Sequence, residues 1–466
     1  MEYFINVNTK EGECVMNEKR SSFSGNIGFI LAAAGSAVGL GNLWRFPYLA
    51  AQYGGGIFLF VYLVLVFTFG FSLLILEIAI GRKTKLSSIS AYEKLNSKFG
   101  WMGYLSMMIP VLILPYYSVI GGWVIKYMTV FLSGQGKAAA EGGYFGGFIG
   151  QTASPLFTFF IYVSLTTIIV ALGVEKGIER VSKFMMPILI LITIGIAVFV
   201  ATVPGAGEGI KYYLLPDFSK FSFKTLCAAM GQLFYSLSIA MGIMVAYGSY
   251  VKDSINLNES VTNIQIFDTL VAFLSGMMIV PAVYVFSGEE GLATGGVGLM
   301  FKTLPVVFDA MPMGNVVGAA FFVLVFLAAL TSSISLMEAI VSMFMDKFKM
   351  TRMKAVVIVY ICTLLLGIPS ALGFGIWSHI TILGMDFLTF FDYISNSVMM
   401  PILAIGTCVL AGWFMNLKDI EDEITKNGES FKRRGIFRVM IKYIAPVFLF
   451  IILVFYTLAQ FGFITF

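Results

Sequence analysis

Charged residues, histidine and paired cysteines are scarce in this chain. Asp, Glu, Lys and Arg make up 12% of the 466 residues, against the quarter that soluble domains usually carry. One histidine, His379, excludes metal sites and catalytic triads that depend on histidine clusters. Cys14, Cys227, Cys362 and Cys408 form no CxxC pair, so a disulfide framework is not supported. The formal net charge of +4 does not indicate a nucleic-acid partner.

Apolar residues, by contrast, make up 58% of the chain, and the mean hydropathy is +0.90. Such a chain cannot cover a soluble core with polar surface, and it could supply about ten or more bilayer spans of roughly 20 residues. The sequence contains no Walker-type phosphate loop, which argues against ATP drive within this chain. It contains no TVGYG-type filter or arginine-periodic voltage sensor, which argues against a channel. We therefore expect an all-α polytopic membrane protein and not an enzyme.

Apolar runs bounded by charges or turn residues predict eleven membrane helices. Their expected ranges are 25–50, 54–80, 102–132, 155–173, 183–203, 225–251, 261–286, 315–345, 355–375, 386–415 and 437–464. Residues 1–24 are charged and lack a signal-peptide core, so we expect a cytosolic tail. A cleaved signal at 25–50 does not fit, because Asn42, Trp44 and Arg45 interrupt its apolar run.

The distribution of lysine and arginine predicts the orientation. With the amino terminus inside, most of the 30 Lys and Arg residues lie on the cytosolic side, as the positive-inside rule requires. The outer loops then carry only Lys137, Lys211, Lys220, Lys224 and Lys302. An odd helix count places the carboxyl terminus outside. We expect a multi-pass protein of the inner (plasma) membrane of the cell.

The first apolar segment contains the helix-weakening run Gly35–Pro47, with the sequence GSAVGLGNLWRFP. One interpretation is close helix packing through a GxxxG face at Gly35 and Gly39. It leaves Asn42 and Arg45 unexplained, because polar and charged groups inside a membrane are costly. The functional interpretation is a broken helix whose free carbonyl groups line a cavity.

The sixth segment is interrupted in a similar way by Gln232, Ser236, Ser238 and Gly242. Two broken helices in corresponding positions are typical of secondary transporters and predict two halves of five helices each. The expected organisation is a tail (1–24), a first five-helix repeat (25–203), an extracellular loop (204–224), a second repeat (225–415), a cytosolic loop (416–436), and an eleventh helix with an extracellular carboxyl terminus (437–466).

Further polar residues lie inside the apolar runs. Ala328, Thr331 and Ser332 share one helix face, and their oxygens could hold a hard cation. Alternatively, the hydroxyls bond the preceding turn. Asp268 and Glu77 are acidic residues within spans. For Asp268 we favour a cation site, and for Glu77 a structural bond to a neighbouring helix remains an equal alternative.

The run Gly35–Pro47, the glycines 54–56 and Glu77 followed by Gly81-Arg82 resemble the signature of the neurotransmitter:sodium symporters. The likeness extends from about Arg20 to the eleventh predicted helix. The chain is most similar to the bacterial eleven-helix branch and to tyrosine transporters within it. The resemblance implies an inverted five-helix repeat of the LeuT type, with helices 1 and 6 broken. It also implies sodium-coupled symport of an amino acid, tyrosine or another aromatic, by alternating access.

The resemblance also implies two sodium sites, with sodium as the coupling ion. The first comprises Ala37, Asn42, Ser236 and Asp268, completed by the substrate carboxylate. The second comprises Gly35, Val38, Ala328, Thr331 and Ser332. Asp268 departs from the asparagine that relatives commonly carry there. A fixed carboxylate would replace the chloride ion that some relatives take from solution, so we expect no chloride requirement.

For the substrate, the resemblance implies that the Leu40 and Gly41 amides and the Tyr117 hydroxyl meet the carboxylate. Carbonyl groups around Ala37, Tyr235 and Ser236 would meet the ammonium group. The implied side-chain pocket consists of Ile113, Tyr117, Tyr235, Ser238, Met241, Ser332 and Leu336. Several relatives have an aromatic residue at the position of Met241, whose flexible side chain could make room for an aromatic substrate.

The resemblance implies gates as well. Arg45 and Asp392 would form an outer latch, with Tyr117 and Tyr235 as a lid, and Arg20 and Asp346 would close the inner side. The inner gate would be supported by Phe23, Ser249 and Tyr250, and Gly177 and Pro187 could help the fifth helix unwind.

Two other functions remain open on the sequence. A proton-coupled amino-acid transporter of the same fold could use Asp268 and Glu77 as proton carriers. A ligand-gated channel or substrate sensor is the alternative from another class. The expected partners are an amino acid, sodium ions and the lipid bilayer, with no nucleic acid and no obligate protein partner.

Overall fold

The computed structural model describes residues 22–293 and 298–460, and every regular element in this part of the chain is a helix. Within it, nine helices are long and apolar enough to cross a membrane. A tenth candidate consists of two short helices that meet at a bend of 53°. The prediction of an all-α polytopic protein is confirmed.

The long helices follow the apolar runs of the sequence. They are α3–η2–α4 (Gly56–Leu65, Val66–Gly70, Phe71–Thr84), α6 (Gly100–Leu132), α9 (Ala153–Ala171), η4–α10 (Val174–Glu179, Arg180–Ala201), α14 (Leu257–Ala293), α16 (Gly314–Phe348), α17 (Arg352–Leu372), α18–η7–α19–η8 (Phe387–Asp392, Tyr393–Met399, Met400–Val409, Leu410–Phe414) and α21–η9–α22 (Arg434–Val439, Met440–Ile444, Ala445–Gln460). The helix predicted at 183–203 begins earlier, at Val174. Its first turns contain the charged residues Glu175, Lys176 and Glu179, so they do not stand out as part of an apolar run.

Two segments are interrupted where the sequence predicts a break. The first consists of α1 (Asn26–Ala37), η1 (Gly41–Arg45) and α2 (Phe46–Gln52). The second consists of α12 (Phe223–Ser236) and α13 (Ile243–Ser249). Neither α12 nor α13 is long enough to span a membrane alone, and the pair is not among the ten candidate spans. The total of eleven therefore stays a prediction.

The second break has an unusual backbone. Ser238, Ala240 and Gly242 have φ angles of 52°, 58° and 71°, a left-handed region that is unfavourable for the first two residues. The carboxylate of Glu77 on α4 accepts a hydrogen bond from the Ala240 amide at 2.8 Å. This contact stabilises the break from a neighbouring helix, as the structural interpretation of Glu77 expects.

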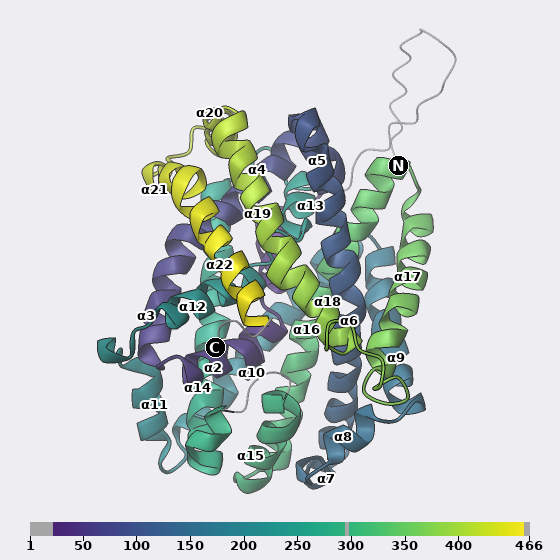
Figure 1. Ribbon diagram of the computed structural model, residues 1–466, viewed down its shortest axis with the longest axis vertical. Coiled ribbons are helices and arrows are strands. Elements are labelled where there is room, and N and C mark those ends of the chain that lie inside the picture. Colours follow the sequence, from purple (N-terminus) through teal and green to yellow (C-terminus); the bar gives the residue numbers. More distant parts are fainter. Residues whose placement is uncertain (1–21, 294–297, 461–466) are drawn as a thin grey trace.

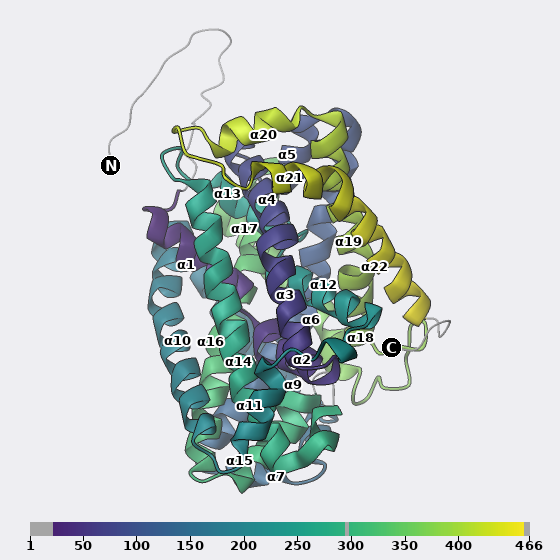
Figure 2. The same ribbon diagram turned by 90° about the vertical axis from the view of Figure 1, so that its left-hand side faces the viewer.

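The short connecting helices gather at the two ends of the bundle (Figures 1 and 2). One end carries α5 (Ser88–Leu95), α20 (Leu417–Ile424) and α21. The opposite end carries α7 (Gly136–Ala140), α11 (Ala206–Leu214) and α15 (Leu304–Ala310), with α8 (Tyr144–Ile149) beside α7. The first group belongs to segments predicted to be cytosolic and the second to segments predicted to be extracellular. The direction in the membrane and the domain boundaries stay predictions.

Long helices surround both breaks. α1 packs against α14 and α16, and α13 packs against α4 and α16. The α4–α13 contact needs glycine on both sides, because a Cβ at Gly81 would lie 2.0 Å from the Val245 carbonyl oxygen and one at Gly248 would lie 2.3 Å from that of Ile78. The two breaks are thereby held in the interior of the bundle.

Candidate functional site

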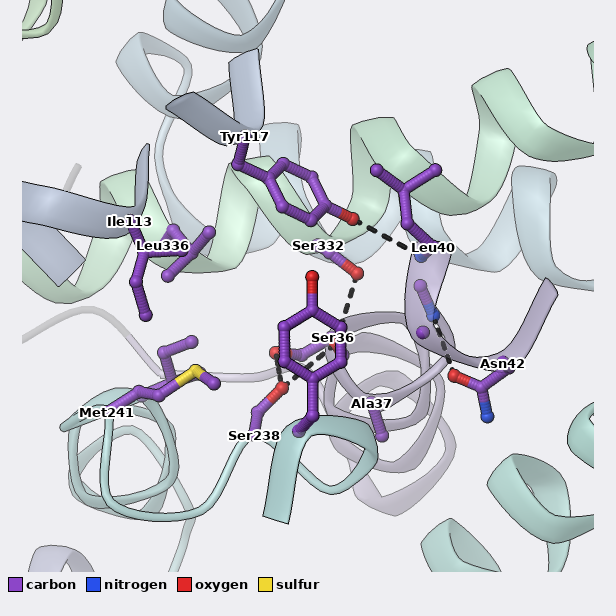
Figure 3. Close-up of a pocket in the computed structure, with 14 residues that line it drawn as sticks. Ser36, Ala37, Leu40, Asn42, Ile113, Tyr117, Ser238, Met241, Ser332 and Leu336 are labelled. Atoms are coloured by element: carbon purple, nitrogen blue, oxygen red, sulfur yellow. Dashed lines mark hydrogen bonds between the residues drawn. The ribbon is translucent and has the colours of Figure 1, made fainter. Parts of the chain in front are cut away.

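A cavity lies where the two broken segments face α6 and α16 (Figure 3). Its lining residues are Ser36, Ala37, Gly39, Leu40, Gly41, Asn42, Ile113, Tyr117, Tyr235, Ser238, Met241, Ile243, Ser332 and Leu336. Every residue predicted to contact substrate is present except Ser236. The cavity volume is about 30 Å³, room for on the order of two water molecules. A larger ligand therefore requires the lining side chains to move apart.

One wall of the cavity joins the first break to α6. The backbone N–H of Leu40 donates to the Tyr117 hydroxyl at 3.4 Å, so two of the groups predicted to hold a carboxylate point toward one another. On the other side, Gln232 Nε2 donates to the Gly41 carbonyl at 3.0 Å. This bond links the first break to α12 of the second broken segment.

A fully buried polar cluster lies next to the cavity. Asn42 Nδ2 lies 2.7 Å from Asp268 Oδ1 and 3.0 Å from Ser236 Oγ, and Ser236 Oγ donates to the same Asp268 oxygen at 2.8 Å. The other Asp268 oxygen accepts from the Tyr62 hydroxyl at 3.4 Å. Asn42 Oδ1 accepts from the Gly39 amide at 3.1 Å, so the Nδ2 side of its amide group faces Asp268 and Ser236. Three of the residues predicted for the first sodium site are thus in direct contact.

The residues predicted for the second sodium site meet between α1 and α16. Ser332 Oγ lies 3.3 Å from the Val38 carbonyl oxygen, and Thr331 Oγ1 lies 3.0 Å from that of Ala328. A Cβ at Gly35 would lie 3.3 Å from the Thr331 Cβ. The Thr331 hydroxyl bonds the preceding turn of α16, as the structural interpretation expects. The Ser332 hydroxyl instead donates to the Ser36 and Val38 carbonyl groups of the first broken segment, which that interpretation does not predict.

Gly35 and Gly39 combine the two interpretations of the first segment. Gly35 packs on Thr331, and a Cβ at Gly39 would lie 2.6 Å from Ser332 Oγ. The glycines therefore do allow close helix packing, and their neighbour is the polar face of α16. Close packing and the broken-helix site occupy the same place.

The predicted outer latch is not formed in this structure. The Arg45 guanidinium lies over the Tyr235 ring, 5.2 Å from its centroid. Asp392 instead accepts hydrogen bonds from the Tyr116 hydroxyl at 2.9 Å and from Asn396 Nδ2 at 2.7 Å. These neighbours hold the carboxylate, and no ion pair joins Arg45 to Asp392. Tyr117 and Tyr235, the predicted lid, both line the cavity.

The inner gate is described in part, because Arg20 lies outside the described residues. Asp346 accepts a hydrogen bond from the Ser87 amide at 2.6 Å. Phe23 is fully buried and its amide donates to the Tyr250 carbonyl at 3.2 Å. The Tyr250 hydroxyl donates to Glu338 at 2.7 Å, and Glu338 also pairs with Arg352. The sequence interpretation missed Glu338 and Arg352.

Three residues that line the cavity were not among the predicted site residues: Ser36, Gly39 and Ile243. Ser36 lies directly before the predicted contact Ala37, but a small polar residue in an apolar run is usually an unremarkable part of a helix. The signal that could have identified it is its position inside the glycine-rich run. Only the tertiary structure shows that the Ser36 hydroxyl bonds that of Ser238 and that the Ser36 carbonyl accepts from the Ser332 hydroxyl.

Comparisons with known proteins agree with this geometry. The chain is 34% identical over 445 residues to the uncharacterized sodium-dependent transporter YhdH of Bacillus subtilis, covering 93% of this chain and 97% of that protein. It is 27% identical to the human sodium- and chloride-dependent GABA transporter 2, covering 87% and 75%. The structure of MhsT in complex with L-phenylalanine superposes with a TM-score of 0.84 at 36% identity, covering 93% of this chain and 99% of MhsT.

These likenesses cover nearly the whole chain and include a solved structure with the LeuT-type fold. Residues 20–136 and 147–464 match the sodium:neurotransmitter symporter family. The chain belongs to this family of sodium-dependent membrane symporters.

Proposed function

We propose that this protein uses sodium entry to drive uptake of an aromatic amino acid, such as tyrosine, by alternating access and without chloride. The observation that carries the proposal is the Asn42–Ser236–Asp268 cluster beside a cavity between two broken helices. The L-phenylalanine bound to MhsT supports an aromatic substrate.

Coupling follows from shared oxygen ligands. Ala37, Asn42, Ser236 and Asp268 hold one sodium ion, and the substrate carboxylate completes its coordination. The Leu40 and Gly41 amides and the Tyr117 hydroxyl bind that same carboxylate. Because the substrate carboxylate is itself one of the ligands of the sodium ion, the ion and the substrate each raise the affinity of the other.

The second sodium ion binds between α1 and α16. Gly35, Val38, Ala328, Thr331 and Ser332 supply carbonyl and hydroxyl oxygens, which suit a hard cation. Because these groups belong to different helices, ion binding favours the conformation that holds α1 against α16. Release of the ion inward would free α1, and unwinding of the turns around Gly177 would open the route.

Charge balance explains the proposed chloride independence. A zwitterionic amino acid is neutral, so sodium in a low-dielectric cavity needs a compensating negative charge. The fully buried Asp268 carboxylate supplies it within the protein. The GABA transporter relative is sodium- and chloride-dependent by name, whereas the bacterial relatives are named sodium-dependent only.

Ligand-induced stabilisation of the purified protein tests the proposal. All twenty amino acids would be screened by thermal shift in sodium and in choline at constant pH. We expect aromatic amino acids to raise the melting temperature in sodium only, and tyramine, which lacks the carboxylate, to have little effect. Equal stabilisation by tyrosine in sodium and choline would contradict the coupling.

Two further measurements separate the alternatives. In proteoliposomes, a proton-coupled transporter would accumulate tyrosine on a pH gradient in choline, whereas we expect accumulation only on a sodium gradient. Counterflow of labelled tyrosine distinguishes a carrier from a channel or a sensor. We expect counterflow, and its absence in a protein that binds tyrosine would contradict transport.

A further inference from the structure

A polar group interrupts the apolar side of the cavity. Ser36 Oγ donates to Ser238 Oγ at 3.2 Å, Ser238 Oγ donates to the Ser36 carbonyl at 3.0 Å, and Ser332 Oγ donates to that carbonyl at 3.1 Å. Figure 3 shows Ser36 and Ser238 in the middle of the site, between Met241 on one side and Ala37 on the other. All three serines are buried.

The hydroxyl protons of these serines are all in use. A serine hydroxyl has one proton to donate and two lone pairs that accept. The Ser36 carbonyl takes the protons of Ser238 and Ser332, and Ser238 Oγ takes the proton of Ser36. The lone pairs of Ser36 Oγ and one lone pair of Ser238 Oγ remain. The pair therefore offers hydrogen-bond acceptors to the cavity and no donor.

These acceptors are not needed for the ionic groups of an amino acid. The amides and the Tyr117 hydroxyl serve the carboxylate, and main-chain carbonyls serve the ammonium group. The remaining lining beside the two serines is apolar, with Ile113, Met241 and Leu336. A ligand without a donor would displace water from these acceptors and leave them without a hydrogen bond, which lowers its affinity.

We propose that Ser36 and Ser238 form an acceptor seat for one N–H or O–H group on an otherwise apolar substrate side chain. The inference rests on the proposed function and narrows its substrate class. Tryptophan, through its indole N–H, and tyrosine, through its phenol O–H, are preferred over phenylalanine. Ser36 is then a specificity-determining residue, since a site built to bond a substrate donor rejects analogues that lack it.

Binding to the purified wild-type protein in sodium tests the seat with two pairs of ligands. Tryptophan is compared with 3-(benzothiophen-3-yl)-L-alanine, in which sulfur replaces the indole N–H, and tyrosine is compared with phenylalanine. We expect the donor-bearing member of at least one pair to bind about tenfold more tightly. Affinity ratios close to one in both pairs would overturn the seat.

Two variants locate the effect. Ser36→Ala removes the main acceptor, and we expect the ratio to fall to about threefold or less. Ser275→Ala is the matched control, because Ser275 is buried, bonds the Val271 carbonyl of its own helix and does not line the cavity. An unchanged ratio in Ser36→Ala would overturn the assignment to Ser36. If that variant does not fold, the affinity ratios of the wild-type protein still test the proposal.

The two proposals fail in different ways. Sodium-dependent binding with no preference for the donor-bearing ligands overturns the seat and leaves the proposed function standing. No sodium-dependent binding of any aromatic amino acid overturns the proposed function, and the seat with it.

Discussion

Asp268 Oδ1 lies 2.7 Å from Asn42 Nδ2, which ties the middle of α14 directly to the break in the first helix. Both side chains are fully buried. A buried carboxylate is stabilised by the hydrogen bonds that it accepts, and here Asn42, Ser236 and Tyr62 all donate to it. A negative charge is therefore placed beside the proposed first sodium ion.

Asp268→Ser is predicted to make uptake depend on chloride. The wild-type protein should transport equally in gluconate and chloride media. The variant should lose most of its uptake in gluconate, because the positive charge of sodium is then uncompensated, and chloride should restore part of it. Labelled tyrosine uptake in proteoliposomes measures this.

The same experiment distinguishes a structural carboxylate. If Asp268 only bonds neighbouring helices, the variant will be inactive in both media. Unchanged uptake in gluconate would contradict the charge-compensating and the structural interpretation alike. Thermal melting of each variant provides the control for folding.

The double variant Thr331→Ala and Ser332→Ala is predicted to lower sodium-driven uptake about tenfold or more, because it removes two proposed sodium ligands. Helix α16 should persist, since alanine favours helices. Ser342→Ala is the matched control, because its buried hydroxyl bonds the Ala339 carbonyl on the same helix. The sodium dependence of uptake is the measurement, and normal uptake by the double variant would show that these are ordinary helix hydroxyls.

Glu179→Gln is predicted to loosen the amino-terminal end of α1. The Glu179 carboxylate accepts hydrogen bonds from the Ser24 amide at 2.8 Å, from the Ser24 hydroxyl and from Lys183 at 2.6 Å. Hydrogen exchange of residues 22–30 should become several-fold faster, because weakening charge-assisted bonds favours local opening. Glu208→Gln, which breaks an exposed pair with Lys211, is the control. Equal exchange rates of residues 22–30 in the two variants would contradict the stabilisation of this segment by Glu179.

Asp253→Asn is predicted to give a small, pH-dependent loss of stability. Hydrogen bonds from Lys426 and Lys85 lower the pKa of Asp253 from 3.8 to about 2. Because the pKa is lower in the folded state, the stabilisation is present above pH 3.8 and is lost as the pH falls toward 2. Half-exposed pairs contribute roughly 0–1 kcal/mol.

Melting curves check the Asp253 prediction. At pH 7 the variant should melt about 1–2 °C below the wild-type protein. The gap should close on acidification and in about 1 M potassium chloride, which screens exposed charges. A difference in melting temperature that stays constant from pH 7 to pH 3, at low and at high salt, would contradict an electrostatic origin of the stabilisation.

Much of the site follows from local sequence. Glycines and polar residues in Gly35–Pro47 and around Ser236–Gly242 predict both breaks. Glycine and proline weaken a helix, and polar side chains are costly in a helix that faces lipid. The predicted pocket residues line one cavity with the exception of Ser236.

Other features depend on partners distant in the sequence. Arg45 and Asp392 have suitable charges for a latch, yet Tyr116 and Asn396 hold Asp392 instead. Glu77 could have been a proton carrier or a structural group, and its bond to the Ala240 amide supports the structural role. Sequence spacing cannot supply these partners, because they come from helices whose relative rotation is set by packing.

The sequence by itself determined that this is a polytopic helical membrane protein with two broken helices, because hydropathy and glycine content act locally along the chain. Tertiary structure alone decided which oxygens face each other. Ser36 and Ser238 are 202 residues apart, and Asn42 and Asp268 are 226 apart. Their contacts exist only because the two broken segments and α14 pack together, and hydrogen bonds form between atoms that packing brings within about 3 Å.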